Sequence, residues 1–385
     1  MIQSASLFGS LFTGLIIAAT NACAVMAFIK FRENGPVPRI RVNYYAAVAV
    51  SIAAANFAFG FLSLLYSGDV GTPVSVALIQ GNIASGDKWQ GSIYDTFDIY
   101  SSLTQEAVEK HMPSIIIWPE TVVNVKLKNY SDLYNSMRQL AMESEAIIMV
   151  GTFDAKTDET TGESKNYNAI FTFYPDGSVG EEPYYKRHPV PFGEYLPWED
   201  FFRRFFPLVA NIRIYDSEIT PGSGAALTET PFGKIGGLVC FDSIYETLTL
   251  DSVREGASLI ALVTNDSWYR DSAAASQHNN HAVLRAVESG RYVARAANTG
   301  ISSIISPHGK TIDSLGALET GYVTGNVYFY GERTLYSYIG NLIVWICFGF
   351  YLTCATIKIY GLISSGYFKN RFKAKPRAKK RAKRL

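Results

Sequence analysis

Residues 234–266, KIGGLVCFDSIYETLTLDSVREGASLIALVTND, contain two apolar runs separated by a segment of mixed polarity. The runs Lys234–Cys240 and Ser258–Thr264 are predicted to form strands, and Tyr245–Gly256 between them is predicted to form a helix. Cys240 closes the first strand, and a polar Asn-Asp pair follows the second. Open α/β sheets place their sites beyond the carboxyl ends of the strands. This unit therefore predicts a layered α/β domain with candidate functional residues at its strand ends.

The same alternation extends over residues 69–333. Helices are predicted at Tyr94–His111, from its length and mixed polarity, and at Gln277–Ala297, from apolar residues at helical spacing. Glu120 stands just beyond a predicted strand, as Cys240 does. The sequence contains no P-loop or dinucleotide-binding fingerprint. The further predicted strands are Val74–Gln80, Ser114–Trp118, Ala146–Phe153, Tyr167–Tyr174, Ile301–Ser306 and Thr311–Leu315.

Three stretches contain no Asp, Glu, Lys, Arg or His: Leu7–Ile29, Val42–Gly68 and Thr334–Ile357. Each exceeds the roughly 20 apolar residues that a helix needs to cross a hydrocarbon core, so each is predicted to span a membrane. The organisation that we expect has four parts. They are two membrane helices (about 7–29 and 42–67) with a basic loop in residues 1–68, a domain at 69–333, a membrane helix at 334–361 and a basic tail at 362–385.

Positive charge outside these stretches predicts the orientation. Ten Lys and Arg residues, and no acidic residue, lie in the tail at 369–384. The loop between the first two stretches carries Lys30, Arg32, Arg39 and Arg41 against Glu33. Basic segments tend to stay on the cytoplasmic side, so three crossings place the 69–333 domain outside. The tail could also be a nucleic-acid arm, but a cytoplasmic tail does not explain an outer domain, and we expect no nucleic-acid partner.

Cys240 is the only cysteine of the 69–333 domain, because Cys23, Cys347 and Cys354 lie in the apolar stretches. A disulfide within the domain is therefore excluded. A lone thiol becomes a nucleophile when a base takes its proton and a nearby positive charge favours the thiolate. Carboxylate and ammonium side chains in the strand-end segments could supply both parts. Each such residue also has an ordinary interpretation, as a small buried side chain, a loop carboxylate or a solvated surface charge.

Several short motifs follow one another in the order Trp118-Pro119-Glu120-Thr121, then Lys186 with Pro191-Phe192-Gly193-Glu194-Tyr195, then Cys240. This order resembles the Glu–Lys–Cys triad of the nitrilase (carbon–nitrogen hydrolase) superfamily. More narrowly, the chain resembles the apolipoprotein N-acyltransferase family over most of residues 74–333. The resemblance implies a nitrilase-like four-layer α-β-β-α sandwich flanked by transmembrane helices. The further matching segments are residues 76–82, Lys88-Trp89, residues 264–268, Gln277-His278, residues 284–288 and residues 297–300.

The resemblance also implies a two-step acyl transfer. Glu120 would deprotonate Cys240, which would take an acyl chain from a phospholipid, expected to be phosphatidylethanolamine, and hold it as a thioester. Lys186 and the backbone N–H of Phe241 would stabilise the oxyanion. The N-terminal amine of a diacylglyceryl apolipoprotein would then accept the acyl chain. The family further implies a multi-pass protein of the bacterial inner membrane, with the domain on the periplasmic side.

Supporting residues are expected from the same resemblance. Glu194 matches a second glutamate that supports the triad, and Trp268 matches an aromatic residue near the active site. Phe241 and Asp242 replace the Tyr-Glu pair that usually follows the family's cysteine. This exchange removes a phenolic hydroxyl and shortens a carboxylate by one methylene group.

The implied chemistry needs no cofactor and no metal. His278 and His281 could suggest zinc, but His278 matches a family position that has no ligand role. We therefore expect no metal site.

Two other functions stay open. One is a membrane-tethered amidase that uses water as the acyl acceptor, although apolar anchors at both ends favour a lipid substrate. The other is a non-catalytic remnant that binds lipid or lipoprotein. Family members normally carry several more helices before the domain than the two expected here, so we expect a truncated or split family member.

Overall fold

The computed structural model describes residues 1–32, 39–65, 68, 71–84, 91–158, 160, 162–206 and 218–364. The chain divides into one compact unit of residues 1–340 and another of residues 341–385. Several features singled out from the sequence lie outside the described residues. They are the basic tail at 369–384, the Lys88-Trp89 pair, Glu33 and the side chains of Arg39 and Arg41.

A six-stranded sheet with the order β12-β1-β2-β3-β4-β5 forms the first half of the domain. The strands β1, β2 and β3 are parallel, whereas β12, β4 and β5 pair antiparallel with their neighbours. The carboxyl ends of the parallel strands share one edge of the sheet, and Glu120 lies toward that edge. The bounds are β1 (Val74–Gln80), β2 (Ile115–Lys126), β3 (Ile147–Thr157), β4 (Ser164–Phe173), β5 (Tyr184–Tyr185) and β12 (Gly321–Val327).

A second six-stranded sheet has the order β11-β10-β9-β8-β7-β6. Its strands β7, β8 and β9 are parallel, and β6, β10 and β11 add antiparallel edges. The strand–helix–strand unit predicted within residues 234–266 is confirmed as β7, α9 and β8. The bounds are β6 (Leu227–Thr230), β7 (Gly233–Val239), α9 (Glu246–Arg254), β8 (Ala257–Thr264), β9 (Tyr292–Ala297), β10 (Ser302–Ile305) and β11 (Thr311–Leu315).

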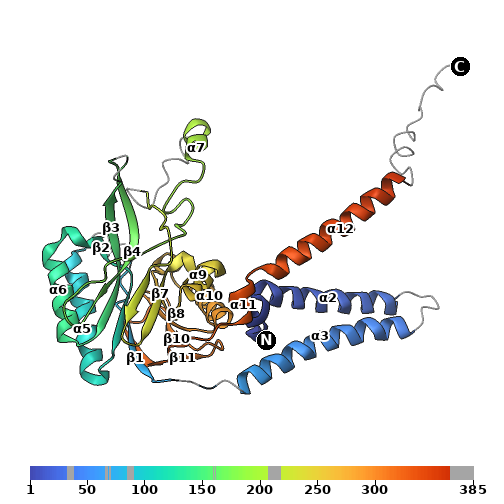
Figure 1. Ribbon diagram of the computed structural model, residues 1–385, viewed down its shortest axis with the longest axis horizontal. Helices are drawn as coiled ribbons and strands as arrows, with labels where there is room; N and C mark the ends of the chain where they lie inside the picture. The colour runs from blue at the N-terminus through green and yellow to red at the C-terminus, as the bar shows by residue number, and fades with distance from the viewer. Residues whose placement is uncertain are drawn as a thin grey trace, which may run out of the picture. The chain divides into compact units, whose positions relative to one another are not determined.

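The two sheets pack face to face, and helices cover their outer faces (Figure 1). Alternation along β2 shows how the sequence builds these layers. Ile115 and Ile117 point into the core between the sheets, whereas Ile116 points outward into the core beneath the helices. The helices α5 (Ile93–His111) and α6 (Ser131–Glu143) cover the first sheet, and α10 (Ala273–Ser289) covers the second. The expected four-layer α-β-β-α sandwich is confirmed.

The helix predicted over Gln277–Ala297 is wrong in its second half. Helix α10 ends at Ser289, and Gly290 follows it with φ +65°, a left-handed conformation that glycine adopts readily. Residues Tyr292–Ala297 then form the fully buried strand β9. A strand that is buried on both faces of a parallel sheet does not alternate apolar and polar residues. Its apolar residues can therefore also fit helical spacing.

Three helices are long and apolar enough to cross a membrane: α2 (Ser10–Arg32), Val42–Leu65 within α3 (Arg39–Leu65), and α12 (Leu342–Ser364). The helices α2 and α3 lie side by side (Figure 1). The stretch expected at 334–357 is divided, because α11 (Leu335–Ile339) ends at Gly340, where φ is +55°. Helix α12 belongs to the second unit.

The start of α2 is fastened to the domain through Glu288. The short helices η1 (Ile2–Ser4) and α1 (Ala5–Phe8) precede α2, and the N–H of Ser10 donates to Glu288 Oε1 at 2.7 Å. Glu288 is buried and pairs with Arg285 at 2.7 Å. Arg285 Nη1 in turn donates to the carbonyl of Ile244 at 3.0 Å, in the turn η3 (Cys240–Ile244). Hydrogen bonds and one ion pair thus connect a candidate membrane helix to the turn that contains Cys240.

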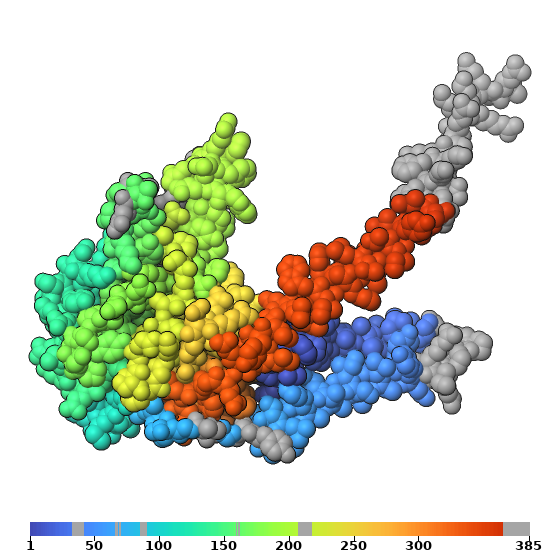
Figure 2. Space-filling model, viewed as in Figure 1, coloured from blue at the N-terminus to red at the C-terminus, as the bar shows by residue number. Residues whose placement is uncertain are grey.

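The short helix α7 (Glu199–Phe205) projects from the body of the domain (Figure 2). Its aromatic side chains are exposed, with Phe201 at 49% and Phe205 at 59% of their full accessibility. Phe201 contacts Phe205 at a ring-centroid distance of 5.1 Å. The projection therefore carries an apolar aromatic surface.

Candidate active site

Glu120 occupies a buried position in β2 where both carboxylate oxygens are hydrogen-bonded. Its Oε1 accepts from Asn168 Nδ2 at 2.7 Å, and its Oε2 accepts from the N–H of Asn265 at 2.9 Å. The neighbouring strand must approach closely here, because a Cβ at Gly151 would lie 2.3 Å from the Pro119 carbonyl oxygen. Neighbours from three separate segments therefore fix the carboxylate of Glu120.

Lys186 lies between two carboxylates. Its Nζ is 3.3 Å from Glu120 Oε1 and 2.8 Å from Glu194 Oε2, and the side chain is almost wholly buried. Burial alone would lower the pKa of Lys186, but the charges of Glu120 and Glu194 outweigh it and raise this pKa well above the usual lysine value. The side chain therefore stays positively charged between the two buried carboxylates.

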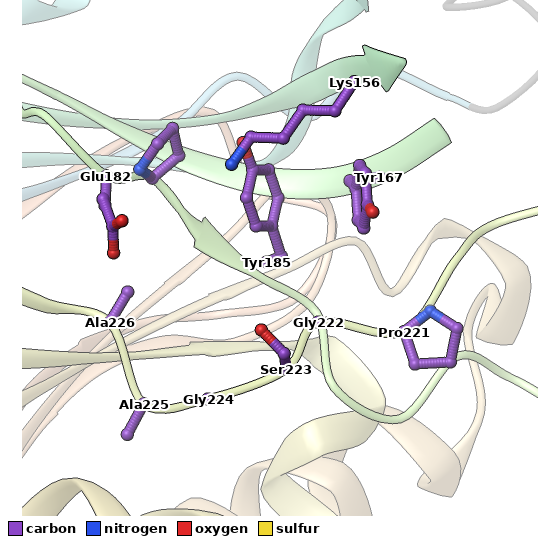
Figure 3. A pocket seen from close by; sticks show the side chains of 11 residues that line it. Lys156, Tyr167, Glu182, Tyr185, Pro221, Gly222, Ser223, Gly224, Ala225 and Ala226 are labelled. Carbon is purple, nitrogen blue, oxygen red and sulfur yellow. The ribbon is translucent and has the colours of Figure 1, made fainter. Parts of the chain in front are cut away.

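The backbone of Lys186 is held from two sides. Its N–H donates to the carbonyl of Asn168 at 2.8 Å, and its carbonyl accepts from the N–H of Gly222 at 2.8 Å. Figure 3 shows Gly222 beside Tyr185, where a pocket of about 300 Å³ borders this segment. A Cβ at position 222 would lie 2.4 Å from the Tyr185 carbonyl oxygen, so this close approach requires glycine.

Glu194 completes the cluster from the loop after β5. Its Oε1 accepts from Lys186 Nζ at 2.9 Å, and its Oε2 accepts from the N–H of Val190 at 2.7 Å. The carboxylate is buried. Glu194 thus holds its own loop in shape while it balances the lysine charge.

Cys240 stands at the junction of β7 and η3 with φ +50°, a left-handed conformation that is uncommon for a residue other than glycine. Burial and the charge of Glu120 raise the pKa of its thiol well above the usual cysteine value, and Lys186 opposes this effect. These surroundings therefore favour the neutral thiol over the thiolate. Glu120, Lys186, Glu194 and Cys240 line one pocket of about 250 Å³.

Asp242 links the Cys240 turn to the Lys186 loop, despite having a shorter side chain than the usual glutamate. Its carboxylate accepts from Tyr184 Oη at 2.9 Å, from the N–H of His188 at 2.8 Å and from the N–H of Val239 at 3.1 Å. The side chain has no solvent exposure. Asp242 therefore joins the two segments by hydrogen bonds without lining the pocket itself.

Phe241 and Trp268 line the same pocket as Cys240. Trp268 belongs to the turn η4 (Ser267–Tyr269) and keeps 49% of its surface exposed. The pocket mouth is consequently aromatic, whereas its base holds the charged cluster.

A buried ionic network behind Cys240 was missed from the sequence. Asp266 accepts from Arg295 Nη2 at 2.8 Å and contacts His278 Nδ1 at 2.8 Å. His278 Nε2 lies 3.2 Å from the Cys240 carbonyl oxygen and 3.1 Å from Ser243 Oγ. Both ring nitrogens of His278 are thus engaged in hydrogen bonds rather than turned toward a shared ligand position with His281. The sequence indicated part of this network, because the polar pair Asn265-Asp266 follows β8. It gave no indication of Arg295, which lies in the part of Gln277–Ala297 that was wrongly predicted to be helical.

Residues 75–330 match the family model described as carbon-nitrogen hydrolase, and the chain belongs to this family. Among curated proteins, it is 32% identical over 352 residues to the apolipoprotein N-acyltransferase of Geobacter metallireducens, which covers 90% of this chain and 65% of that protein. It is 28% identical over 307 residues to the protein of the same name from Nitrosomonas europaea, with coverages of 78% and 58%. The expected resemblance to apolipoprotein N-acyltransferases is confirmed, and the chain spans less than two thirds of the length of these relatives.

Solved structures show the same fold. Nit3 of Saccharomyces cerevisiae superposes with a TM-score of 0.51 at 17% identity, covering 71% of this chain and 95% of that chain. The NitFhit protein of Caenorhabditis elegans gives a TM-score of 0.52 at 17% identity, with coverages of 67% and 61%. At these identities the likeness shows the fold alone. The expected nitrilase-like fold is confirmed.

Proposed function

We propose that this chain moves an acyl chain from a membrane phospholipid to the N-terminal amine of a lipidated cysteine in lipoproteins, through a thioester on Cys240. The observation that carries the proposal is the buried Glu120–Lys186–Glu194 cluster in the same pocket as Cys240. The curated relatives named apolipoprotein N-acyltransferase support the choice of substrates.

In the first step Glu120 takes the thiol proton and Cys240 Sγ attacks the ester carbonyl of the phospholipid, expected to be phosphatidylethanolamine. The oxyanion that forms is stabilised by the Lys186 ammonium and by the N–H of Phe241. The carbon–oxygen bond of the ester then breaks, and the proton held by Glu120 passes to the departing oxygen of the lysophospholipid. A thioester remains on Cys240.

In the second step the free amine of the diacylglyceryl apolipoprotein attacks the thioester carbonyl. Glu120 accepts the proton that the amine loses, and the carbon–sulfur bond breaks to give the amide product. The proton on Glu120 then passes to the departing Cys240 Sγ, which restores the thiol and the carboxylate.

The proposed location is the bacterial inner membrane, with the domain on the periplasmic side. Three candidate membrane helices support a multi-pass arrangement. The exposed aromatic surface of α7 and the aromatic mouth of the pocket favour a lipid over a small soluble amide.

The test is mass spectrometry of the intact chain, purified in detergent and incubated with phosphatidylethanolamine. An acyl adduct should form on the wild type and be absent from Cys240→Ala. A diacylglyceryl peptide should then remove the adduct and gain the acyl chain, whereas release of free fatty acid with no peptide product would indicate a hydrolase. If no adduct forms where a full-length relative reacts, the catalytic proposal is wrong.

A further inference from the structure

A third pocket lies where the chain just before α2 and the end of α3 meet the domain. It has a volume of about 260 Å³, and its lining includes Ser6, Ser63, His308, Glu332 and Arg333. It shares no lining residue with the pocket at Cys240. It is therefore a separate cavity.

The two helices that border this pocket indicate its position relative to a membrane. Ser6 lies shortly before the start of the candidate span Ser10–Arg32, and Ser63 lies in the last turn of the candidate span Val42–Leu65. Two helices that span a membrane would leave its hydrocarbon core at these positions, which would place the pocket at the level of the lipid headgroups.

Glu332 and Arg333 form no ion pair among the residues that the structure describes. Arg333 Nη2 donates to the carbonyl of Arg254 rather than to a carboxylate. Both side chains are exposed at the pocket wall. A ligand with charges of both signs would satisfy this adjacent pair.

A buried arginine behind the wall adds positive charge. Arg291 is 1% exposed, and among the described residues its guanidinium donates only to backbone carbonyls, including those of Gly290 at 3.1 Å and Gly331 at 3.2 Å. Burial and the nearby charge of Arg333 lower the pKa of Arg291 to about 10. A buried cation without a carboxylate is costly, and an anion beside it would offset that cost.

We propose that this pocket binds the phosphodiester headgroup of a resident membrane phospholipid, with the phosphate at Arg333 and a headgroup ammonium at Glu332. The hydroxyl of Ser63 offers a further donor to the phosphate, and the guanidinium is suited to phosphate oxygens. The lipid is a structural ligand that is not consumed, and the proposal is independent of acyl transfer. It assigns a second lipid position to the chain, at the joint between membrane and domain.

The test is native mass spectrometry of the full chain carrying Cys240→Ala, so that no acyl adduct forms. The protein is delipidated in detergent and titrated separately with phosphatidylethanolamine, phosphatidylglycerol, diacylglycerol, glycerophosphoethanolamine and inorganic phosphate. Arg333→Gln should weaken binding of both phospholipids about tenfold, the loss expected for one charge-assisted hydrogen bond. Glu332→Gln should weaken phosphatidylethanolamine alone, because phosphatidylglycerol has no ammonium.

The matched control is Lys110→Gln, an exposed cation on α5 that pairs with Glu106 and is absent from the pocket lining. It should leave lipid binding unchanged, and all variants should keep the wild-type thermal transition. Equal retention of lipid by Arg333→Gln, or equal binding of diacylglycerol, would overturn the proposal. Binding of inorganic phosphate as tight as that of the lipids would show a soluble-anion site instead and would overturn the lipid assignment.

Discussion

Asp266→Asn tests the ionic network behind Cys240. The substitution keeps the shape of the side chain but removes its charge, which leaves the guanidinium of Arg295 buried at 0% exposure without a counter-charge. The local structure cannot relax easily, because Gly300 packs so closely that a Cβ there would lie 2.0 Å from Asp266 Oδ2. Breaking a buried ion pair by neutralising one partner costs about 3–5 kcal/mol.

The amide oxygen of Asn can still accept one hydrogen bond, so we expect a loss near the lower end, about 3 kcal/mol. For a domain of this size that corresponds to a fall in Tm of about 6–12 °C. The assay is thermal unfolding of the full chain in detergent micelles, followed by tryptophan fluorescence. The initial rate of acyl-adduct formation should also fall about tenfold, because His278 loses its carboxylate partner and holds the Cys240 carbonyl less firmly.

The difference between wild type and variant should depend on pH. Burial opposes ionisation of Asp266, but the charge of Arg295 and the His278 contact outweigh it and hold the pKa of this carboxyl well below its usual value. A lowered pKa contributes stability above the unfolded-state value of about 4 and loses it as the pH falls further. The gap in Tm should therefore be constant from pH 5 to 8 and should narrow below about pH 4.

Asp132→Asn is the matched control. The pKa of Asp132 is also lowered, mainly by a hydrogen bond from Tyr94, but the group is on the surface. Its loss should leave the thermal transition near that of the wild type. A drop of less than about 2 °C for Asp266→Asn, or a gap that stays constant down to pH 3, would refute the reasoning.

Three further perturbations follow from the site. Gly237→Ala would bring a Cβ within 2.8 Å of Tyr184 Cγ between the sheets, and thermal unfolding should show a loss of about 1–3 kcal/mol; an unchanged transition would contradict the packing. Glu120→Gln removes a charge that raises the pKa of the Cys240 thiol, so alkylation by iodoacetamide at pH 8 should become faster while acyl-adduct formation stops. Slower alkylation would argue against Glu120 as the neighbouring charge. Phe205→Ser removes part of the exposed aromatic surface of α7 and should slow adduct formation from vesicles more than from detergent-dispersed lipid; an equal effect on both would separate α7 from the membrane.

The sequence predicted the positions of Glu120 and Cys240 because each ends a long apolar run, and such runs are governed by burial within parallel strands. The Lys186 segment gave no signal of this kind. Its strand, β5, contains two residues and is placed by pairing with β4, a contact distant in sequence. Its part in the site could be predicted only through the family resemblance.

The boundary between α10 and β9 shows a different limit. Gly290 was a readable stop signal, but the apolar residues after it continue the helical spacing. These residues form a strand because they pair with β8. Arg295 lies within that strand and pairs with Asp266 only because β8 and β9 are neighbours. The network behind Cys240 is a product of sheet topology, which local patterns do not encode.

The contact between Ser10 and Glu288 bears on how the domain can be isolated. A soluble fragment cut from residue 69 would lose the N–H that Glu288 Oε1 accepts at 2.7 Å. It would also uncover the face of α10 that contacts α1. The Glu288–Arg285 pair, and through it the carbonyl of Ile244, would then face water on one side. The first helices are therefore packed against the part of the domain that supports the Cys240 turn. A fragment without them would change the surroundings of that turn, so its activity would not represent that of the whole chain.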